Sequence, residues 1–179
     1  MSSAPRYRPT YTVEDYARWE GEWELWDGMP VSMSPSPFGR HAQLLVRIAT
    51  QLELAVEQSG CEAAVLAEID WIISNDTVVR PDVSVVCGDV PIRHVEQPPA
   101  LIAEVLSDAT RSRDVREKKG LYRDQGVRWY LVIDPEANSL LAWSLDADGS
   151  YQSVPTTESL AVKICSDCRL SLDVKRMLR

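Results

Sequence analysis

Residues 99–106 of this 179-residue chain read PALIAEVL, an apolar run interrupted by a single carboxylate, Glu104. A short and nearly continuous apolar run predicts a β-strand that is buried on both faces. Residues 113–125 then carry apolar positions at helical spacing, and Trp129–Ile133 predicts a second buried strand. Strand, helix and strand in succession form a βαβ crossover, so we expect the two strands to be parallel neighbours.

Shorter elements surround this unit. The dipeptides Asp27-Gly28 and Asp148-Gly149 predict two β-hairpins, and Gly60 ends a helix that begins at about His41. This mixture predicts an α/β (mixed α+β) fold in a single domain over residues 1–179, with a central mixed β-sheet flanked by helices. The other expected elements are a short helix from Thr12 to about Trp19, strands at 63–68, 70–74 and 78–87, hairpin strands at 22–26, 29–33, 140–145 and 151–154, a closing strand at 160–165 and a C-terminal helix.

The composition is that of an ordinary globular domain, with 45% apolar and 26% charged residues. The N-terminal residues lack the apolar core of a signal peptide, and no stretch approaches the length of a membrane span, so we expect a cytoplasmic protein. A reducing location predicts free cysteines, and we interpret Cys165 and Cys168 as structural thiols in the last strand and turn. The alternative for this CxxC pair is a metal or redox site, but Cys61 and Cys87 do not form a second such pair.

The formal net charge of −8 argues against a general polyanion binder, but the charge is unevenly distributed. From Arg111 to Arg128 seven basic and three acidic residues give a local charge of +4, which leaves −12 on the remainder. A solvated amphipathic helix would explain this stretch. A basic surface beside a functional site is the other interpretation.

A second carboxylate, Asp82, also stands where a strand should carry an apolar residue, because it follows Pro81 and opens the run 83–86. If the strands of Asp82 and Glu104 are neighbours, the two carboxylates could bind one Mg²⁺ or Mn²⁺, with water filling the other positions. The alternative is that each carboxylate caps a loop or pairs with a nearby arginine.

A lysine in the expected helix strengthens the metal hypothesis. Val115, Lys118, Leu121 and Tyr122 lie on or beside one helical stripe, which directs Lys118 towards the sheet and its carboxylates. A lysine beside a metal-bound phosphate can stabilise developing negative charge or orient an attacking water. Lys119 lies close to the same stripe, so spacing alone does not separate the two lysines, and a snorkelling lysine at the helix edge is the alternative.

Taken together, these motifs resemble the PD-(D/E)XK nuclease superfamily, and more closely the Uma-type group of bacterial restriction endonucleases. The similarity extends from about Tyr11 to Trp143. The matching segments are Trp23–Gly28, His41 at the start of the long helix, Pro81-Asp82, Glu104–Ser107, Glu117-Lys118 with Tyr122, and Tyr130–Pro135.

The resemblance implies a restriction-endonuclease-like core with a metal-dependent phosphodiesterase site. Asp82 and Glu104 would hold the metal, the Val105 carbonyl would complete its shell, and a water would attack phosphorus. The superfamily lysine position is occupied here by Leu106. The Uma-type group takes its lysine from the following helix, and the spacing to Tyr122 selects Lys118.

Two further residues enter the site through the resemblance. Glu24 would be a third carboxylate that binds metal directly or through water, although a surface glutamate is the ordinary interpretation. His41 would lie near the phosphate, although a lone histidine there more often serves the core or a helix cap.

Two functions follow from these residues. The first is a Mg²⁺-dependent DNA endonuclease, for which a homodimer is a natural arrangement because a duplex needs two cuts. The second is a catalytically silent nucleic-acid-binding or protein-binding module on a nuclease scaffold, suggested by the acidic total charge and by Leu106.

Overall fold

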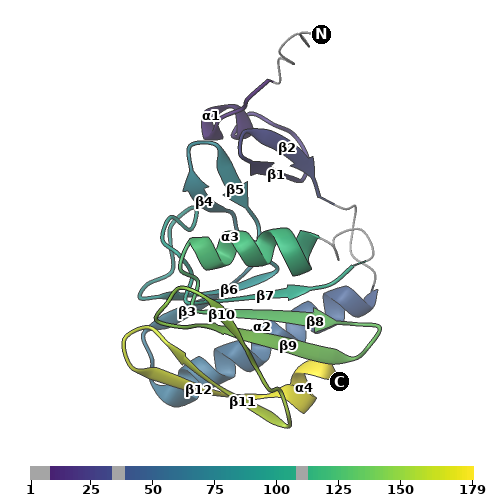
Figure 1. The fold of residues 1–179 in the computed structure, drawn as a ribbon, viewed down its shortest axis with the longest axis vertical. Helices are drawn as coiled ribbons and strands as arrows, with labels where there is room; N and C mark the ends of the chain where they lie inside the picture. The colour runs from purple at the N-terminus through teal and green to yellow at the C-terminus, as the bar shows by residue number, and fades with distance from the viewer. Residues whose placement is uncertain (1–8, 34–38, 108–112) are drawn as a thin grey trace.

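The computed structural model describes residues 9–33, 39–107 and 113–179 (Figure 1). Within these ranges the strands form a six-stranded central sheet, a four-stranded N-terminal sheet and a two-stranded C-terminal hairpin. The central sheet is mixed: β7 and β8 are parallel and its other neighbours are antiparallel. In spatial order its strands are β10 (Tyr151–Val154), β9 (Ser139–Leu145), β8 (Trp129–Asp134), β7 (Leu101–Val105), β6 (Val83–Cys87) and β3 (Ala63–Ala67).

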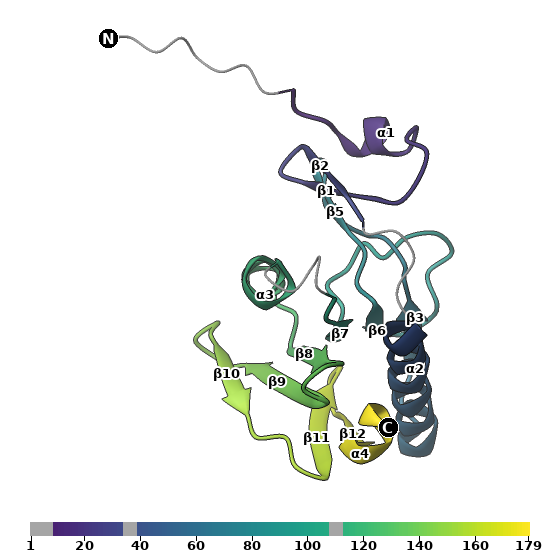
Figure 2. The same cartoon turned by 90° about the vertical axis from the view of Figure 1, so that its right-hand side faces the viewer.

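The long helix α2 (Gly39–Ser59) covers one face of the central sheet (Figure 2). Its apolar stripe, which includes Leu44, Ile48 and Leu52, packs against the aliphatic side chains of that face. The C-terminal hairpin, β11 (Ser159–Ile164) with β12 (Cys168–Asp173), closes the same core together with α4 (Val174–Leu178). This layer of aliphatic side chains is the larger of the two buried clusters.

The opposite face is covered by a helix in two parts, the π-helical turn η1 (Arg113–Lys118) and α3 (Lys119–Asp124). This helix connects β7 to the parallel strand β8, which confirms the βαβ unit predicted from the sequence. The core here is rich in aromatic rings. Tyr122 stacks on Trp71 and meets Tyr130 edge to face, with ring centroids 6.0 and 5.2 Å apart.

The N-terminal sheet lies at the top of the molecule in Figure 1, next to α1 (Val13–Tyr16). A capping box begins α1, because the side chains of Thr12 and Asp15 each accept a hydrogen bond from the other residue's backbone amide. In spatial order the sheet contains β2 (Met29–Ser32), β1 (Trp23–Trp26), β5 (Thr77–Val79) and β4 (Trp71–Ser74).

Three expectations from the sequence are wrong. The strand expected over 78–87 is broken at Arg80–Asp82 into β5 and β6, because Pro81 has no amide hydrogen for the ladder. The strand β12 was not expected, although Leu170 and Leu172 alternate with exposed residues. The four cysteines are not thiols: Cys61 is bonded to Cys168 and Cys87 to Cys165.

Candidate active site

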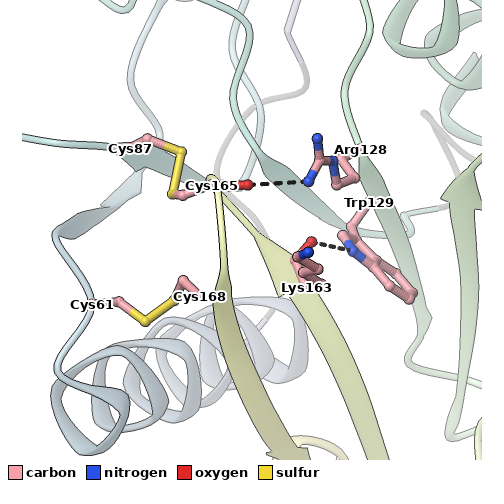
Figure 3. Close-up of a disulfide and its surroundings, with 7 residues drawn as sticks. All are labelled: Cys61, Cys87, Arg128, Trp129, Lys163, Cys165 and Cys168. Carbon is pink, nitrogen blue, oxygen red and sulfur yellow. Dashed lines mark hydrogen bonds between the residues drawn. A yellow bond between two sulfur atoms is a disulfide. The ribbon is translucent and has the colours of Figure 1, made fainter.

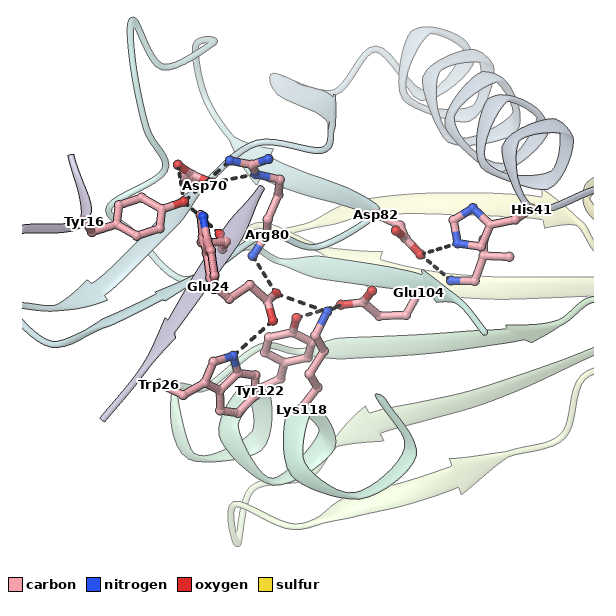
Figure 4. Close-up of polar contacts among 12 residues, drawn as sticks. Tyr16, Glu24, Trp26, His41, Asp70, Arg80, Asp82, Glu104, Lys118 and Tyr122 are labelled. Atoms are coloured by element: carbon pink, nitrogen blue, oxygen red, sulfur yellow. Dashed lines mark hydrogen bonds and ion pairs between the residues drawn. The ribbon is translucent and has the colours of Figure 1, made fainter. Parts of the chain in front are cut away.

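Glu104 is the centre of a buried polar cluster on the α3 face of the central sheet (Figure 4). Alternation along β7 places its side chain on the same face as Ile102. Its Oε1 lies 3.0 Å from Nζ of Lys118 and accepts a 2.7 Å hydrogen bond from the Tyr122 hydroxyl. Only 2% of Glu104 and 5% of Lys118 are exposed to solvent. A buried carboxylate is thus met by a cation, as the sequence required.

Glu24 reaches the same cluster from β1 of the N-terminal sheet. Its Oε1 lies 3.3 Å from Nζ of Lys118 and accepts a 3.0 Å hydrogen bond from the backbone amide of Arg80. Its Oε2 accepts a 3.0 Å bond from the indole of Trp26. With 1% of its surface exposed, Glu24 is not the surface glutamate of the ordinary interpretation. The N-terminal sheet places it over α3, which the sequence did not reveal.

The structure separates the two candidate lysines. Lys118 ends the π-helical turn and points into the cluster, whereas Lys119 begins α3 and lies over the ring of Trp143, 4.0 Å from its centroid. Burial lowers the pKa of Lys119, but no carboxylate contact is described for it. Lys118 is therefore the lysine beside Glu104. π-Helical turns occur frequently at functional sites.

Asp82 lies between Glu104 and the start of α2. The pairing of Val83 with Ala103 makes β6 and β7 neighbours, so Asp82 lies across from Glu104, although its carboxylate turns towards Val105 and His41 and that of Glu104 towards Lys118 (Figure 4). Oδ2 of Asp82 accepts a 2.6 Å hydrogen bond from the Val105 amide and lies 3.5 Å from Nε2 of His41. Its side chain is 17% exposed, so it is the acidic group of the site that meets solvent.

The charge of His41 depends on these neighbours. Burial lowers its pKa, but the hydrogen bond with Asp82, the charge of Asp82 and a hydrogen bond with the Val105 backbone together raise it above the ordinary value. The raised pKa favours the protonated form of His41 beside Asp82. The Nδ1 atom of His41 is buried and has no hydrogen-bond partner among the described residues.

The cluster around Glu104 contains two carboxylates, from Glu24 and Glu104, but one ammonium, from Lys118. Burial and the charge of Glu104 raise the pKa of Tyr122 well above its usual value, so its hydroxyl remains a donor. Two buried carboxylates share the ammonium of Lys118, and burying such groups costs several kcal/mol per ion unless they are paired. Residues that break the ordinary rules of a core in this way mark functional sites.

The oxygen donors suit a hard divalent cation. Mg²⁺ is usually held by one or two carboxylates with water in its remaining positions. Asp82 and Glu104 supply such a pair on neighbouring strands. In the described part of the chain, no group of three or more histidine, cysteine, aspartate or glutamate side chains is arranged around a common metal position.

Reasoning from the sequence missed two members of the site. Tyr122 was quoted in the resemblance but given no role, and Arg80 was not noticed. The signal for Arg80 was its place before Pro81, where a broken strand frees an amide for Glu24. The basic stretch is only partly described, since Arg111 lies outside the described residues; Arg116, Arg123 and Arg128 are exposed.

Comparisons with known proteins agree with this picture. A family model described as "Putative restriction endonuclease" (Uma2) matches residues 13–174. The chain is also similar to the crystal structure of a "putative nuclease belonging to DUF820" from Anabaena variabilis ATCC 29413, with 16% identity and a TM-score of 0.73. The match covers 93% of this chain and 97% of that chain and confirms the predicted nuclease-like fold. No curated protein matches the chain.

Proposed function

Because this chain belongs to the Uma2 restriction-endonuclease family, we propose that it is a metal-dependent endonuclease that hydrolyses DNA phosphodiester bonds with an activated water. The observation that carries the proposal is the convergence of Lys118 with Glu104, next to Asp82 on the adjoining strand. Buried charged side chains add nothing to hydrophobic packing, whereas phosphoryl transfer needs both anionic metal ligands and a cation.

Asp82 and Glu104 would hold Mg²⁺ or Mn²⁺, with the Val105 carbonyl as a further ligand. When bound, the cation would neutralise phosphate charge and lower the pKa of a coordinated water. The Val105 amide already fixes one oxygen of Asp82 through its 2.6 Å hydrogen bond. Because that contact occupies Oδ2, the other oxygen, Oδ1 of Asp82, would be the atom that binds the metal.

The remaining side chains would hold Lys118 and the metal-binding carboxylates in position. Lys118 would stabilise the negative charge that develops on the phosphate during attack. Glu24 and Glu104 keep its ammonium in place, at 3.3 and 3.0 Å. Tyr122 orients Glu104 through its 2.7 Å hydrogen bond, and His41 orients Asp82. In this assignment Glu24, Tyr122 and His41 are positioning residues.

DNA is the substrate that we propose, with the exposed arginines beside α3 supplying contacts to its phosphates. We further propose a single domain that works in the cytoplasm, and a homodimer that would cut both strands of a duplex. No described helix has the length and apolar character needed to cross a membrane.

A plasmid assay tests the proposal. Purified protein with Mg²⁺ should nick supercoiled plasmid, and chelation of the metal should stop it. Asp82→Ala should reduce nicking at least about a hundredfold, because loss of a metal ligand removes several kcal/mol of transition-state stabilisation. Arg18→Ala is a matched control, since Arg18 lies in an exposed ion pair with Glu14. Equal nicking by wild type and Asp82→Ala would refute the assignment.

One observation favours the silent-module alternative. Glu104 is almost fully buried and already bound by Lys118 and Tyr122, so a metal must compete with both donors. Calorimetric titration with Mn²⁺ separates the two functions. Binding that disappears in Glu104→Ala supports the endonuclease, and absence of binding to the wild type supports the silent module.

A further inference from the structure

All four cysteines of the chain lie together, where the start of β3, the end of β6 and the turn of the C-terminal hairpin meet (Figure 3). Cys61 follows α2 and Cys87 ends β6, whereas Cys165 and Cys168 flank the turn of the C-terminal hairpin. The Cα atoms of the bonded pairs are 5.8 and 5.6 Å apart. The four residues line one open cavity of about 670 Å³.

Both disulfides connect the turn of the C-terminal hairpin to the rest of the fold. A disulfide stabilises a fold mainly by closing a loop in the unfolded chain. The Cys61–Cys168 bond already closes a separation of 107 residues. The Cys87–Cys165 bond closes a separation of 78 residues and joins the same turn to the same end of the central sheet. Both bonds can therefore stabilise the fold, and they also bring four sulfurs to one place.

The cysteines are held in place by contacts other than their disulfides. The hairpin packs on α2 and the sheet through Leu160, Val162, Leu170 and Leu172, each no more than 2% exposed. The side chain of Arg128 donates a 3.1 Å hydrogen bond to the carbonyl oxygen of Cys165. Breaking the two S–S bonds would consequently leave four thiols gathered around the same cavity.

Four gathered thiolates form the donor set of a structural zinc site. Cys₄ sites bind Zn²⁺ tetrahedrally, and a C-x₂-C pair on a turn commonly supplies two of the ligands. Here Cys165 and Cys168 are such a pair, and Cys61 and Cys87 would supply the other two from adjoining positions, since Ala63 pairs with Cys87. We propose that the reduced chain binds one Zn²⁺ through Cys61, Cys87, Cys165 and Cys168, and that oxidation replaces this site by the two disulfides.

The exchange between the two states balances. Each S–S bond is broken by a dithiol reductant, which supplies two electrons and two protons and becomes a cyclic disulfide. The four resulting thiols lose four protons as four Zn–S bonds form. Cys87 is exposed, so a small reductant can reach one of the bonds directly. Arg128 next to Cys165 would moderate the negative charge of the tetrathiolate centre.

Cobalt serves as a spectroscopic probe of the site. The full chain is reduced with dithiothreitol, freed of reductant without oxygen, and titrated with Co²⁺. We expect about one equivalent to produce the visible absorption of tetrahedral Co²⁺ together with a near-ultraviolet thiolate-to-cobalt band. The oxidised chain, checked for absence of free thiols, should produce neither signal. Zn²⁺ should displace the cobalt and abolish both.

Variants identify the ligands. Cys87→Ser should lower the affinity for Co²⁺ at least about tenfold and weaken the thiolate band. Ser166→Ala, in the turn between the two ligands, should behave like wild type. Asp82→Ala should also keep the thiolate band, so failure of the nuclease assignment would not affect this test. A fully reduced, folded wild-type chain without a thiolate-to-cobalt band would overturn the proposal, whether or not the variants fold.

Discussion

The two faces of the central sheet differ sharply in what they bury. On β7, Ala103 and Val105 face α2 within a core that is almost wholly aliphatic. Ile102 and Glu104, the residues that alternate with them, face α3 among tyrosines, tryptophans and charged groups. The α2 face gains stability from each side chain that it buries. The α3 face tolerates buried charges because the other face supplies that stability.

The largest effect is expected where charge is buried. Lys118→Met keeps the length of the side chain but leaves Glu24 and Glu104 without their shared cation. Removing one partner of a buried pair should lower the free energy of unfolding by about 3–5 kcal/mol. Urea denaturation measures the loss. Lys119→Met is the matched control, and loss of its contact with Trp143 should cost only about 0.5–1 kcal/mol. Equal losses would mean that the buried ion pairs of Lys118 contribute no more to stability than the contact of Lys119 with Trp143.

A substitution on the α2 face should affect stability alone. Leu52→Ala removes a fully buried side chain from α2 and should destabilise the protein by about 2–5 kcal/mol. Plasmid nicking per folded molecule should stay at the wild-type rate. Leu54→Ala on the same helix, where the residue is 39% exposed, should cost much less. A loss of nicking in folded Leu52→Ala would contradict the idea that the α2 face contributes to stability and the α3 face to activity.

Tyr122→Phe removes a single hydroxyl that donates to a carboxylate. Hydrogen bonds to charged groups contribute about 1.5–3 kcal/mol, so we expect a loss of unfolding free energy in that range. Tyr151→Phe provides a comparison, because its hydroxyl donates to the neutral carbonyl of Val127 at 2.8 Å. That variant should lose about 0.5–1.5 kcal/mol. A larger loss of unfolding free energy in Tyr151→Phe than in Tyr122→Phe would contradict this prediction.

The smallest effect concerns pH. The pKa of His41 is raised in the folded chain, so its cationic form stabilises that chain. This contribution is complete below the ordinary value of 6.5 and disappears as the pH rises through the folded value. In metal-free buffer, wild type should exceed His41→Gln in urea midpoint by more at about pH 5.5 than at about pH 8.5. If the difference in urea midpoint between the two proteins increased with pH, the prediction would be wrong.

Much of the fold followed from local patterns. The βαβ unit, α2 and both hairpins were predicted because apolar periodicity and Asp-Gly turns are local signals. The break at Arg80–Asp82 was missed because the residues on both sides of Pro81 are typical of strands, and the expected strand was drawn through it. Cysteine pairing could not be predicted, since four cysteines allow three connectivities and only the fold selects one.

The site was predictable to a similar degree. Glu104 and Asp82 stood out because each is a carboxylate within an apolar run, and helical spacing pointed to Lys118. The burial of Glu24 was not predictable in this way. It depends on the contact of β1 with Lys118 of η1, and a four-residue strand carries no signal of its distant neighbours.

The three residues Arg80–Asp82 connect the N-terminal sheet to the central sheet, and both sides of the site depend on them. The amide of Arg80 holds Glu24, and the carboxylate of Asp82 holds the Val105 amide. Any shift of this connection would therefore disturb the surroundings of both carboxylates at once, so Glu24 and Asp82 cannot be repositioned independently of each other.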